Sequence, residues 1–384
     1  MRAGRKSGGS RSSGGSRSSG GSRIPLKTRK SGAGASKGPT VGETGEFALI
    51  DRLVRILGSA SPEPPEGPGD DAAVLGPHRS QTLVTTDVQE EDVHFRRSWT
   101  LPGELGEKAL EINLSDIAAM GGVPTVCLVS LVLPPELPLH AIEDLYRGLR
   151  RAAVRGGVKV VGGNVSSTRS GRLSIHVTQL GNTPGGLVCR DGGSPGDLLV
   201  VTGMPGLATL GRRLIERSAG RESLWDNGPK LPAWRREPRL QGSVARAALD
   251  RFLTPRARVK EGPWLAGLGA TAMIDVSDGL AGDLRHLAAA GGTGIEIDLE
   301  RLPRPAGVDA LCAWAGADWS ELALAGGEDY ELLFAIPESR WIEATRPRGF
   351  RFSVIGRLTT ARQGLTVRDR HGVRPLFEEG FHHF

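Results

Sequence analysis

Hydrophobic and polar residues follow two different spacings along this chain, and together they predict a mixture of helices and strands. Helices are predicted over residues 46–57, 106–120, 139–155, 207–218 and 280–289. Short runs rich in β-branched residues predict strands over 83–88, 126–133, 158–161, 173–180 and 198–202. Because these elements follow no regular β-α-β rhythm, we expect an α+β fold rather than a doubly wound parallel sheet.

A Gly- and Pro-rich stretch over residues 181–196 divides the sequence. A chain of 384 residues is long enough for two domains. We therefore expect a tail over residues 1–41, a first α+β domain over 42–184 and a second α+β domain over 185–384. Residues 219–240 are rich in Trp and Pro, and they are predicted to form an irregular insertion in the second domain.

The net charge of +6 comes from the N-terminal tail. Residues 1–40 hold ten of the 49 lysines and arginines and none of the 43 acidic residues, so the rest of the chain carries 39 basic and 43 acidic residues, a net charge of −4. We expect the Gly/Ser/Arg repeat to be disordered, because it has too little apolar surface to offset the entropy lost on ordering. A solvated tail without a specific role, a misplaced start codon and a nucleic-acid-binding arm all stay open as explanations of the tail, whereas the body shows no sign of nucleic-acid binding.

Composition also predicts the compartment. The tail lacks the apolar segment of a secretory signal, and no run of eighteen apolar residues predicts a membrane span. Cys127, Cys189 and Cys312 are scattered, so they predict neither a disulfide framework nor a zinc site. We expect a cytoplasmic protein.

Five short motifs, each with at least one carboxylate, are spread along the sequence. They are Gly69-Asp-Asp-Ala-Ala73, Thr85-Thr-Asp87, Asn113-Leu-Ser-Asp116, Asp275-Val-Ser-Asp-Gly279 and Gly326-Gly-Glu-Asp-Tyr330. If the motifs meet in the folded chain, their oxygen atoms form a site suited to Mg²⁺ and a polyphosphate. The chain has no G-x-x-x-x-G-K-[ST], strand-borne G-x-G-x-x-G, H-E-x-x-H or G-x-S-x-G motif, so nucleotide chemistry here would require another kind of site.

Taken alone, each motif also has a purely structural interpretation. Asp116 borders the apolar arc of its predicted helix, where a carboxylate either binds a metal or caps a neighbouring loop. Asp71 also suits an ordinary turn. The stretch 275–279 leads from a strand into a helix, so it either presents helix amides to a phosphate or forms a simple N-cap. Glu328 and Asp329 are expected at a solvated loop tip.

Further motifs accompany these five in a fixed order. They include Gly45-Glu-Phe47, Val93-His-Phe95, Lys108-Ala-Leu110, Gly162-Gly163, Pro195-Gly-Asp197, Val201-Thr-Gly203 and Gly380-Phe-His-His-Phe384. The ordered set, over residues 42–384, closely resembles the thiamine-monophosphate kinase family of the aminoimidazole-ribonucleotide-synthetase-like superfamily. The motifs at 113–121 and 326–334 favour this family over its superfamily relatives.

The resemblance implies two α+β domains, the first of which binds ATP and Mg²⁺ and pairs with a second copy in a homodimer. It implies direct, in-line transfer of the γ-phosphoryl group of ATP to thiamine monophosphate, which yields thiamine diphosphate and ADP. Several Mg²⁺ ions would hold the phosphates, because two polyanions must be brought together. The acceptor phosphate is already ionised near pH 7, so no acid–base catalyst is assigned.

The resemblance also implies site residues at the matched positions. The metal shell would comprise Asp71, Thr85, Thr86, Asp87, Asp116, Asn164, Asp275 and Asp278. ATP would contact Tyr146, Gly163, Asn164, Arg190 and Ser277. Thiamine monophosphate would contact His94, Glu328 and Phe381. Arg190 suits a phosphate clamp, and Phe381 suits stacking on a heteroaromatic ring.

Two positions depart from the usual pattern of the family. Asn164 replaces an aspartate, which removes one negative charge and is expected to weaken metal binding there. Phe381 replaces a tryptophan and offers a smaller aromatic surface. Two other functions stay open: a superfamily synthetase that acts on a different ATP-activated substrate, and a non-catalytic sensor of thiamine phosphate or nucleotide.

Overall fold

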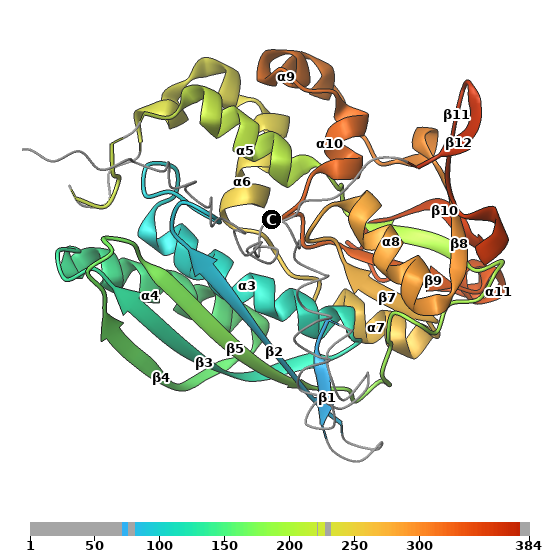
Figure 1. Ribbon diagram of the computed structural model, residues 1–384, viewed down its shortest axis with the longest axis horizontal. Coiled ribbons are helices and arrows are strands. Elements are labelled where there is room, and N and C mark those ends of the chain that lie inside the picture. Colours follow the sequence, from blue (N-terminus) through green and yellow to red (C-terminus); the bar gives the residue numbers. More distant parts are fainter. Residues whose placement is uncertain (1–70, 76–80, 221, 227–231, 377–384) are drawn as a thin grey trace, which may run out of the picture.

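The computed structural model describes residues 71–75, 81–220, 222–226 and 232–376. The expected tail, the helix predicted over 46–57 and Phe381 lie outside these residues. The described chain forms two β-sheets, each packed against helices (Figure 1). The α+β class predicted from the sequence is therefore confirmed.

The first sheet has five strands in the order β1-β2-β5-β3-β4. Its strands are β1 (Ala73–Leu75), β2 (Thr82–Glu90), β3 (Val123–Leu133), β4 (Lys159–Ser167) and β5 (Ser174–Asn182). Neighbouring strands are antiparallel except for the parallel pair β3–β4. The helices α3 (Pro102–Ala119) and α4 (Leu139–Gly156) cover one face of this sheet, where every second residue of β3 from Cys127 to Leu131 joins the core.

The second sheet has seven strands in the order β12-β11-β8-β10-β6-β9-β7. Its strands are β6 (Leu198–Thr202), β7 (Ala272–Asp275), β8 (Thr293–Asp298), β9 (Leu332–Ile336), β10 (Phe352–Thr360), β11 (Leu365–Asp369) and β12 (Gly372–Pro375). The helices around it are α5 (Leu207–Ser218), α6 (Ser243–Leu253), α7 (Glu261–Leu268), α8 (Leu280–Gly291), α9 (Val308–Ala315), α10 (Trp319–Ala325) and α11 (Glu338–Glu343). Helices lie on both faces, so β6 and β9 are buried throughout and consist almost entirely of apolar residues.

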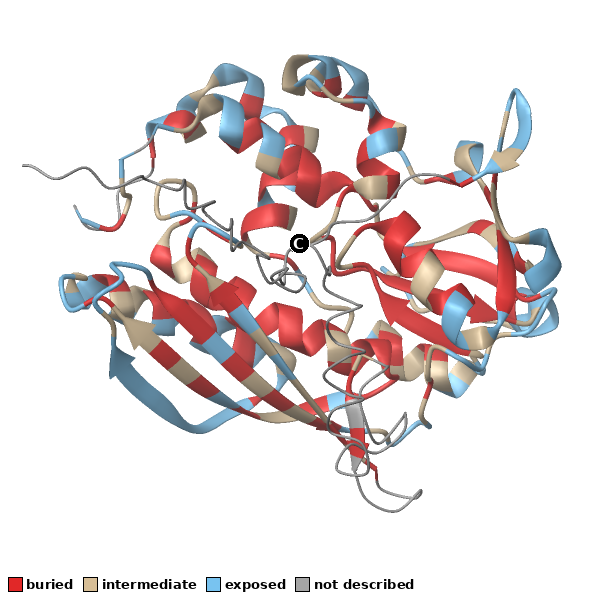
Figure 2. Ribbon diagram, viewed as in Figure 1, coloured by how far each residue is buried: buried red, intermediate tan, exposed pale blue. Residues whose placement is uncertain are grey.

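Helix α3 lies between the two sheets and belongs to both cores (Figure 1). Figure 2 shows it buried along nearly its whole length. Its last turn packs against α7 so closely that a Cβ on Gly262 would lie 2.2 Å from the carbonyl oxygen of Ala118. Only glycine allows this approach, which holds the two domains together at this end of the helix. None of the helices in the described part of the chain is both long and apolar enough to cross a bilayer.

The sequence located several elements correctly and misjudged the ends of others. Residues 198–202 and 207–218 form β6 and α5 as predicted. The strand predicted over 158–161 was too short, because β4 continues through the Gly162-Gly163 pair to Ser167. A Cβ on Gly163 would lie 1.8 Å from the carbonyl oxygen of Val129, so this glycine permits close pairing of β3 and β4 instead of ending the strand.

The irregular segment over 219–240 connects the two cores. In its described part, Trp225 is fully buried in the core of the first domain, and Trp234 is buried in the core of the second. The Trp225 ring stacks on Phe95 with a centroid separation of 6.4 Å, and its Nε1 donates a hydrogen bond of 2.9 Å to the carbonyl oxygen of Thr100. Short 3₁₀ turns, η2 (Ala233–Arg236) and η3 (Pro238–Gln241), lead from it into α6. Two further 3₁₀ turns are η4 (Leu299–Arg301) and η5 (Ala361–Gln363).

Replacing Trp225 by Ala should therefore destabilise the protein by about 3–5 kcal/mol, because a large buried ring leaves a cavity. Trp225→Phe keeps a ring but leaves the Thr100 carbonyl oxygen without the indole N–H donor. Its loss of stability should therefore be smaller, about 1–3 kcal/mol. Urea unfolding followed by circular dichroism measures both values. Wild-type stability in the alanine variant would show that the segment does not contribute to the core.

Candidate functional site

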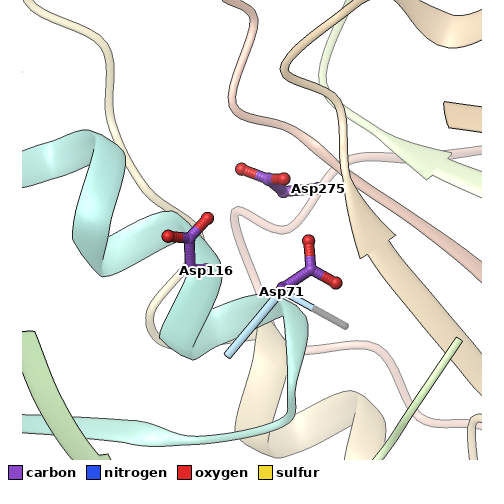
Figure 3. Close-up of side chains that lie close together, drawn as sticks. All are labelled: Asp71, Asp116 and Asp275. Carbon is purple, nitrogen blue, oxygen red and sulfur yellow. The ribbon is translucent and has the colours of Figure 1, made fainter. Parts of the chain in front are cut away.

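Three carboxylates from distant parts of the sequence converge in the space between the domains (Figure 3). Asp71 precedes β1, Asp116 lies on α3 and Asp275 ends β7. One oxygen atom of each lies within 4.8 Å of the corresponding atoms of the other two. Three of the five acidic motifs found in the sequence therefore meet at one place.

Strand β2 adds two further side chains to this cluster. The Thr85 hydroxyl donates a hydrogen bond of 2.7 Å to Oδ2 of Asp116. Asp87 is two residues further along the strand, so it projects from the same face and also interacts with Asp116. Thr86 projects from the opposite face, where its hydroxyl donates to the carbonyl oxygen of Val177 at 3.0 Å.

The cluster carries unfavourable negative charge. Burial raises the pKa of Asp116 well above its usual range, and the neighbouring charges of Asp87 and Asp275 raise it further. The pKa of Asp275 is likewise raised well above its usual range by burial and then by the charge of Asp71. Arg190 offsets part of this charge through a forked ion pair with Asp71, with N···O distances of 2.9 and 3.0 Å.

Sequence reasoning missed several polar residues that support the cluster. The Ser115 hydroxyl donates a hydrogen bond of 2.6 Å to Asp275, and Oδ1 of Asn113 accepts one of 3.2 Å from the backbone N–H of Asp87. Both residues belong to the motif Asn113–Asp116, and the signal for Asn113 was that it interrupts the apolar face of its helix. Asp283 on α8 is also buried, and burial together with the charges of Asp278 and Asp275 raises its pKa well above the usual range.

The Gly-Gly-Glu-Asp loop lies against the loop that holds Ser277. The backbone N–H of Glu328 donates a hydrogen bond of 2.7 Å to the carbonyl oxygen of Ser277, and that of Tyr330 donates one of 2.8 Å to Val276. A Cβ on Gly327 would lie 2.4 Å from the Ser277 carbonyl oxygen, so a larger residue would separate the two loops. The loops thereby hold Glu328 next to the Ser277 segment.

The expectation that Glu328 and Asp329 lie at a solvated loop tip was wrong for Asp329. Its carboxylate is fully buried and caps α5 by accepting hydrogen bonds from the backbone N–H groups of Gly206 and Ala208, at 2.5 and 2.9 Å. Burial raises the pKa of Asp329 to about 7, although these two amides oppose the shift. Glu328 is partly exposed, and its carboxylate forms an ion pair of 2.6 Å with Lys108.

The next acid in this loop is buried as well. Glu331 accepts a forked ion pair from Arg258, with both contacts at 2.5 Å, and a further contact of 2.8 Å from Arg251. These arginines keep the pKa of Glu331 below its usual range despite burial. A cavity of about 410 Å³ beside this ion pair includes none of the predicted site residues in its lining.

Other predicted residues lie away from the carboxylate cluster. Tyr146 is exposed on α4, and Gly163 and Asn164 are exposed on the edge strand β4. Two strands separate β4 from β2, so Asn164 and Asp87 are about 14 Å apart across the sheet of one chain. His94 lies just beyond β2, where its Nδ1 accepts a hydrogen bond of 3.0 Å from the backbone N–H of Glu90.

Comparison with known proteins supplies the context for this geometry. The family model "AIR synthase related protein, N-terminal domain" matches residues 69–183, and "AIR synthase related protein, C-terminal domain" matches residues 194–368. The chain is 39% identical over 311 residues to the thiamine-monophosphate kinase of Mycobacterium tuberculosis (strain ATCC 25618 / H37Rv), an alignment that covers 80% of this chain and 85% of that protein. It is 38% identical over 299 residues to the thiamine-monophosphate kinase of Aquifex aeolicus, covering 78% and 88% respectively.

A solved structure described as AaThiL complexed with AMPPCP and TMP matches the fold with a TM-score of 0.75. The two proteins are 34% identical, and the match covers 90% of this chain and 99% of the other. With both domain models matched and relatives of this similarity over most of its length, the chain belongs to the AIR synthase related proteins and, among them, to the thiamine-monophosphate kinase family.

Proposed function

We propose that this protein transfers the γ-phosphoryl group of ATP to thiamine monophosphate and so forms thiamine diphosphate and ADP. The observation that carries the proposal is the convergence of Asp71, Asp116 and Asp275 in a member of this kinase family. The related structure with AMPPCP and TMP supports both substrates, since one is an ATP analogue and the other corresponds to the acceptor.

The donor set of the cluster suits Mg²⁺. It consists of carboxylate and hydroxyl oxygens, which hard divalent cations prefer, and it contains no soft ligand. The raised pKa values of Asp116 and Asp275 show that the cluster is unfavourable as a set of bare anions, a cost that a cation would remove. Asp71, Asp116 and Asp275 would hold Mg²⁺, with Thr85, Asp87 and Asp278 beside them. When bound, Mg²⁺ supplies the positive charge that neutralises the phosphate groups.

The remaining residues of the site would bind and orient the two substrates. Arg190 presents a planar guanidinium next to Asp71, a geometry suited to clamping phosphate oxygens of ATP. Ser277 lies just ahead of α8, where hydroxyl and backbone N–H groups can bind a phosphate. The acceptor phosphate is an adequate nucleophile in its ionised form, so the residues act by holding the two phosphates in line rather than by moving protons.

A second copy of the chain would complete the site. The sheet face opposite α3 and α4 carries exposed apolar side chains such as Val88 and Leu128, and β4 is exposed over its whole length (Figure 2). Asn164 is too far from Asp87 to share an ion with it within one chain. We propose a homodimer in which the open faces pair and place Tyr146, Gly163 and Asn164 of one copy near the carboxylates of the other.

The proposed activity is tested by incubating the purified protein with ATP, thiamine monophosphate and Mg²⁺ and quantifying thiamine diphosphate by chromatography. We expect product in wild type and a loss of at least 100-fold in Asp116→Ala, because the cluster that neutralises phosphate charge is broken. Binding of both ligands without product would favour a non-catalytic sensor. ATP consumption with another acceptor alone would favour a related synthetase.

Asp275→Asn should separate metal binding from stability. The amide carbonyl can still accept the Ser115 hydrogen bond, and the variant removes a carboxylate whose charged form is disfavoured by burial, so its melting temperature in EDTA at pH 8 should equal or exceed that of wild type. Mg²⁺ at roughly 100 times its Kd should stabilise wild type by about 2.7 kcal/mol and the variant by much less. Asp250→Asn, at an exposed position on α6, is the control. Unfolding of Asp275→Asn in EDTA would assign this carboxylate a structural role.

Leu128→Asp tests the proposed dimer. Leu128 is 42% exposed on the open face of β3, and a carboxylate there would have to be desolvated when two copies pair. We expect light scattering to show a dimer for wild type and a shift toward monomer for the variant, together with loss of kinase activity. Val373→Asp, on the exposed part of β12, should leave both unchanged. A fully active wild-type monomer would contradict the dimer.

A further inference from the structure

A buried lysine of the first domain contacts the candidate substrate carboxylate of the second. Lys108 lies on α3 with a side chain only 3% exposed, and its Nζ is 2.6 Å from Oε1 of Glu328. The same ammonium group lies 4.3 Å from the centroid of the Phe252 ring on α6. Lys108 and Glu328 are 220 positions apart in the sequence, so only the arrangement of the two domains brings them together.

Stability alone does not explain a lysine at this position. A buried ammonium group loses its hydration, and an ion pair of this kind is often no more stabilising than apolar residues of the same size. The Phe252 ring and the Glu328 carboxylate compensate for the loss, but a methionine would fill the same space without incurring it. The presence of a charged side chain at position 108 therefore indicates that its role is to bind the Glu328 carboxylate.

The ion pair completes the restraint on Glu328. Its backbone has a φ of 66°, an unfavourable value for a residue with a side chain, and its N–H is bonded to the Ser277 carbonyl. Its carboxylate is 28% exposed, and within the described part of the chain Lys108 is its only hydrogen-bonding or ion-pairing partner. Without Lys108, the rotatable bonds of the glutamate would let the carboxylate leave this position.

We propose that Lys108 is a positioning residue for thiamine monophosphate. It holds the Glu328 carboxylate in one rotamer through Oε1, so that Oε2 can bind the cationic thiazolium ring or the amino group of the pyrimidine. The proposal rests on the proposed kinase function and extends it to a residue that acts through Glu328 rather than by contacting the substrate itself. Because Lys108 acts on the acceptor pocket, its loss should affect thiamine monophosphate much more than ATP.

Lys108→Met tests this division. We expect the KM for thiamine monophosphate to rise roughly 10- to 100-fold, the effect of losing a charge-assisted hydrogen bond, with the KM for ATP changed less than about twofold. Calorimetric titration of thiamine monophosphate into protein holding AMPPCP and Mg²⁺ should show the same loss of affinity without any turnover. Lys260→Met, which removes an exposed lysine, is the control and should match wild type.

The double variant Lys108→Met/Glu328→Gln shows whether Lys108 works through Glu328. If it does, the double variant should lose no more affinity than Glu328→Gln alone, because the lysine has nothing left to position. The double variant also replaces the ion pair by neutral groups, so it provides the comparison if Lys108→Met fails to fold. Additive losses, a fall in kcat with unchanged KM, or wild-type affinity in Lys108→Met would each overturn the proposal. A wild-type protein that neither binds nor phosphorylates thiamine monophosphate would instead overturn the proposed function.

Discussion

The burial of α3 between two sheets is the constraint on which the site depends. A helix in this position cannot leave polar side chains without partners, because water is excluded from both of its sides. Three of its polar side chains find partners in the second domain: Ser115 bonds to Asp275, Lys108 pairs with Glu328, and Glu111 accepts a hydrogen bond of 2.7 Å from the backbone N–H of Ala257. The same contacts determine both the relative position of the domains and the positions of the carboxylates. A substitution that changes one therefore also changes the other.

The segment around Trp225 strengthens this arrangement from outside the site. A chain that anchors one tryptophan in each core resists separation of the domains, because either ring would have to become exposed. Arg256 acts in the same direction, since it reaches from the end of α6 to Glu107 on α3 with an N···O distance of 2.7 Å. Stabilising contacts thus surround α3 while the acidic cluster beside it remains electrostatically unfavourable, a combination that is common at functional sites.

Periodicity in the sequence was sufficient to predict the position and the ends of elements such as β6 and α5. Their ends coincide with clear changes from apolar to Gly- and Pro-containing segments. Convergence of Asp71, Asp116 and Asp275 could be expected only from the resemblance to a family, because no local pattern relates residues so far apart. Periodicity does separate Thr85 and Thr86, which alternate across β2 and face different neighbours. The burial of Asp329 could not be predicted, since its partners are backbone amides of a helix that lies 121 to 123 positions earlier.

The loop from Glu328 to Glu331 has a consequence for how this protein can change over evolution. Its acids lie in different surroundings: Glu328 is partly exposed and pairs with Lys108 of the first domain, whereas Asp329 and Glu331 are buried. Insertion or deletion of a single residue would exchange these surroundings, so that the partly exposed carboxylate would be buried and the helix cap would face solvent. The contacts of this loop therefore constrain its length as well as its composition.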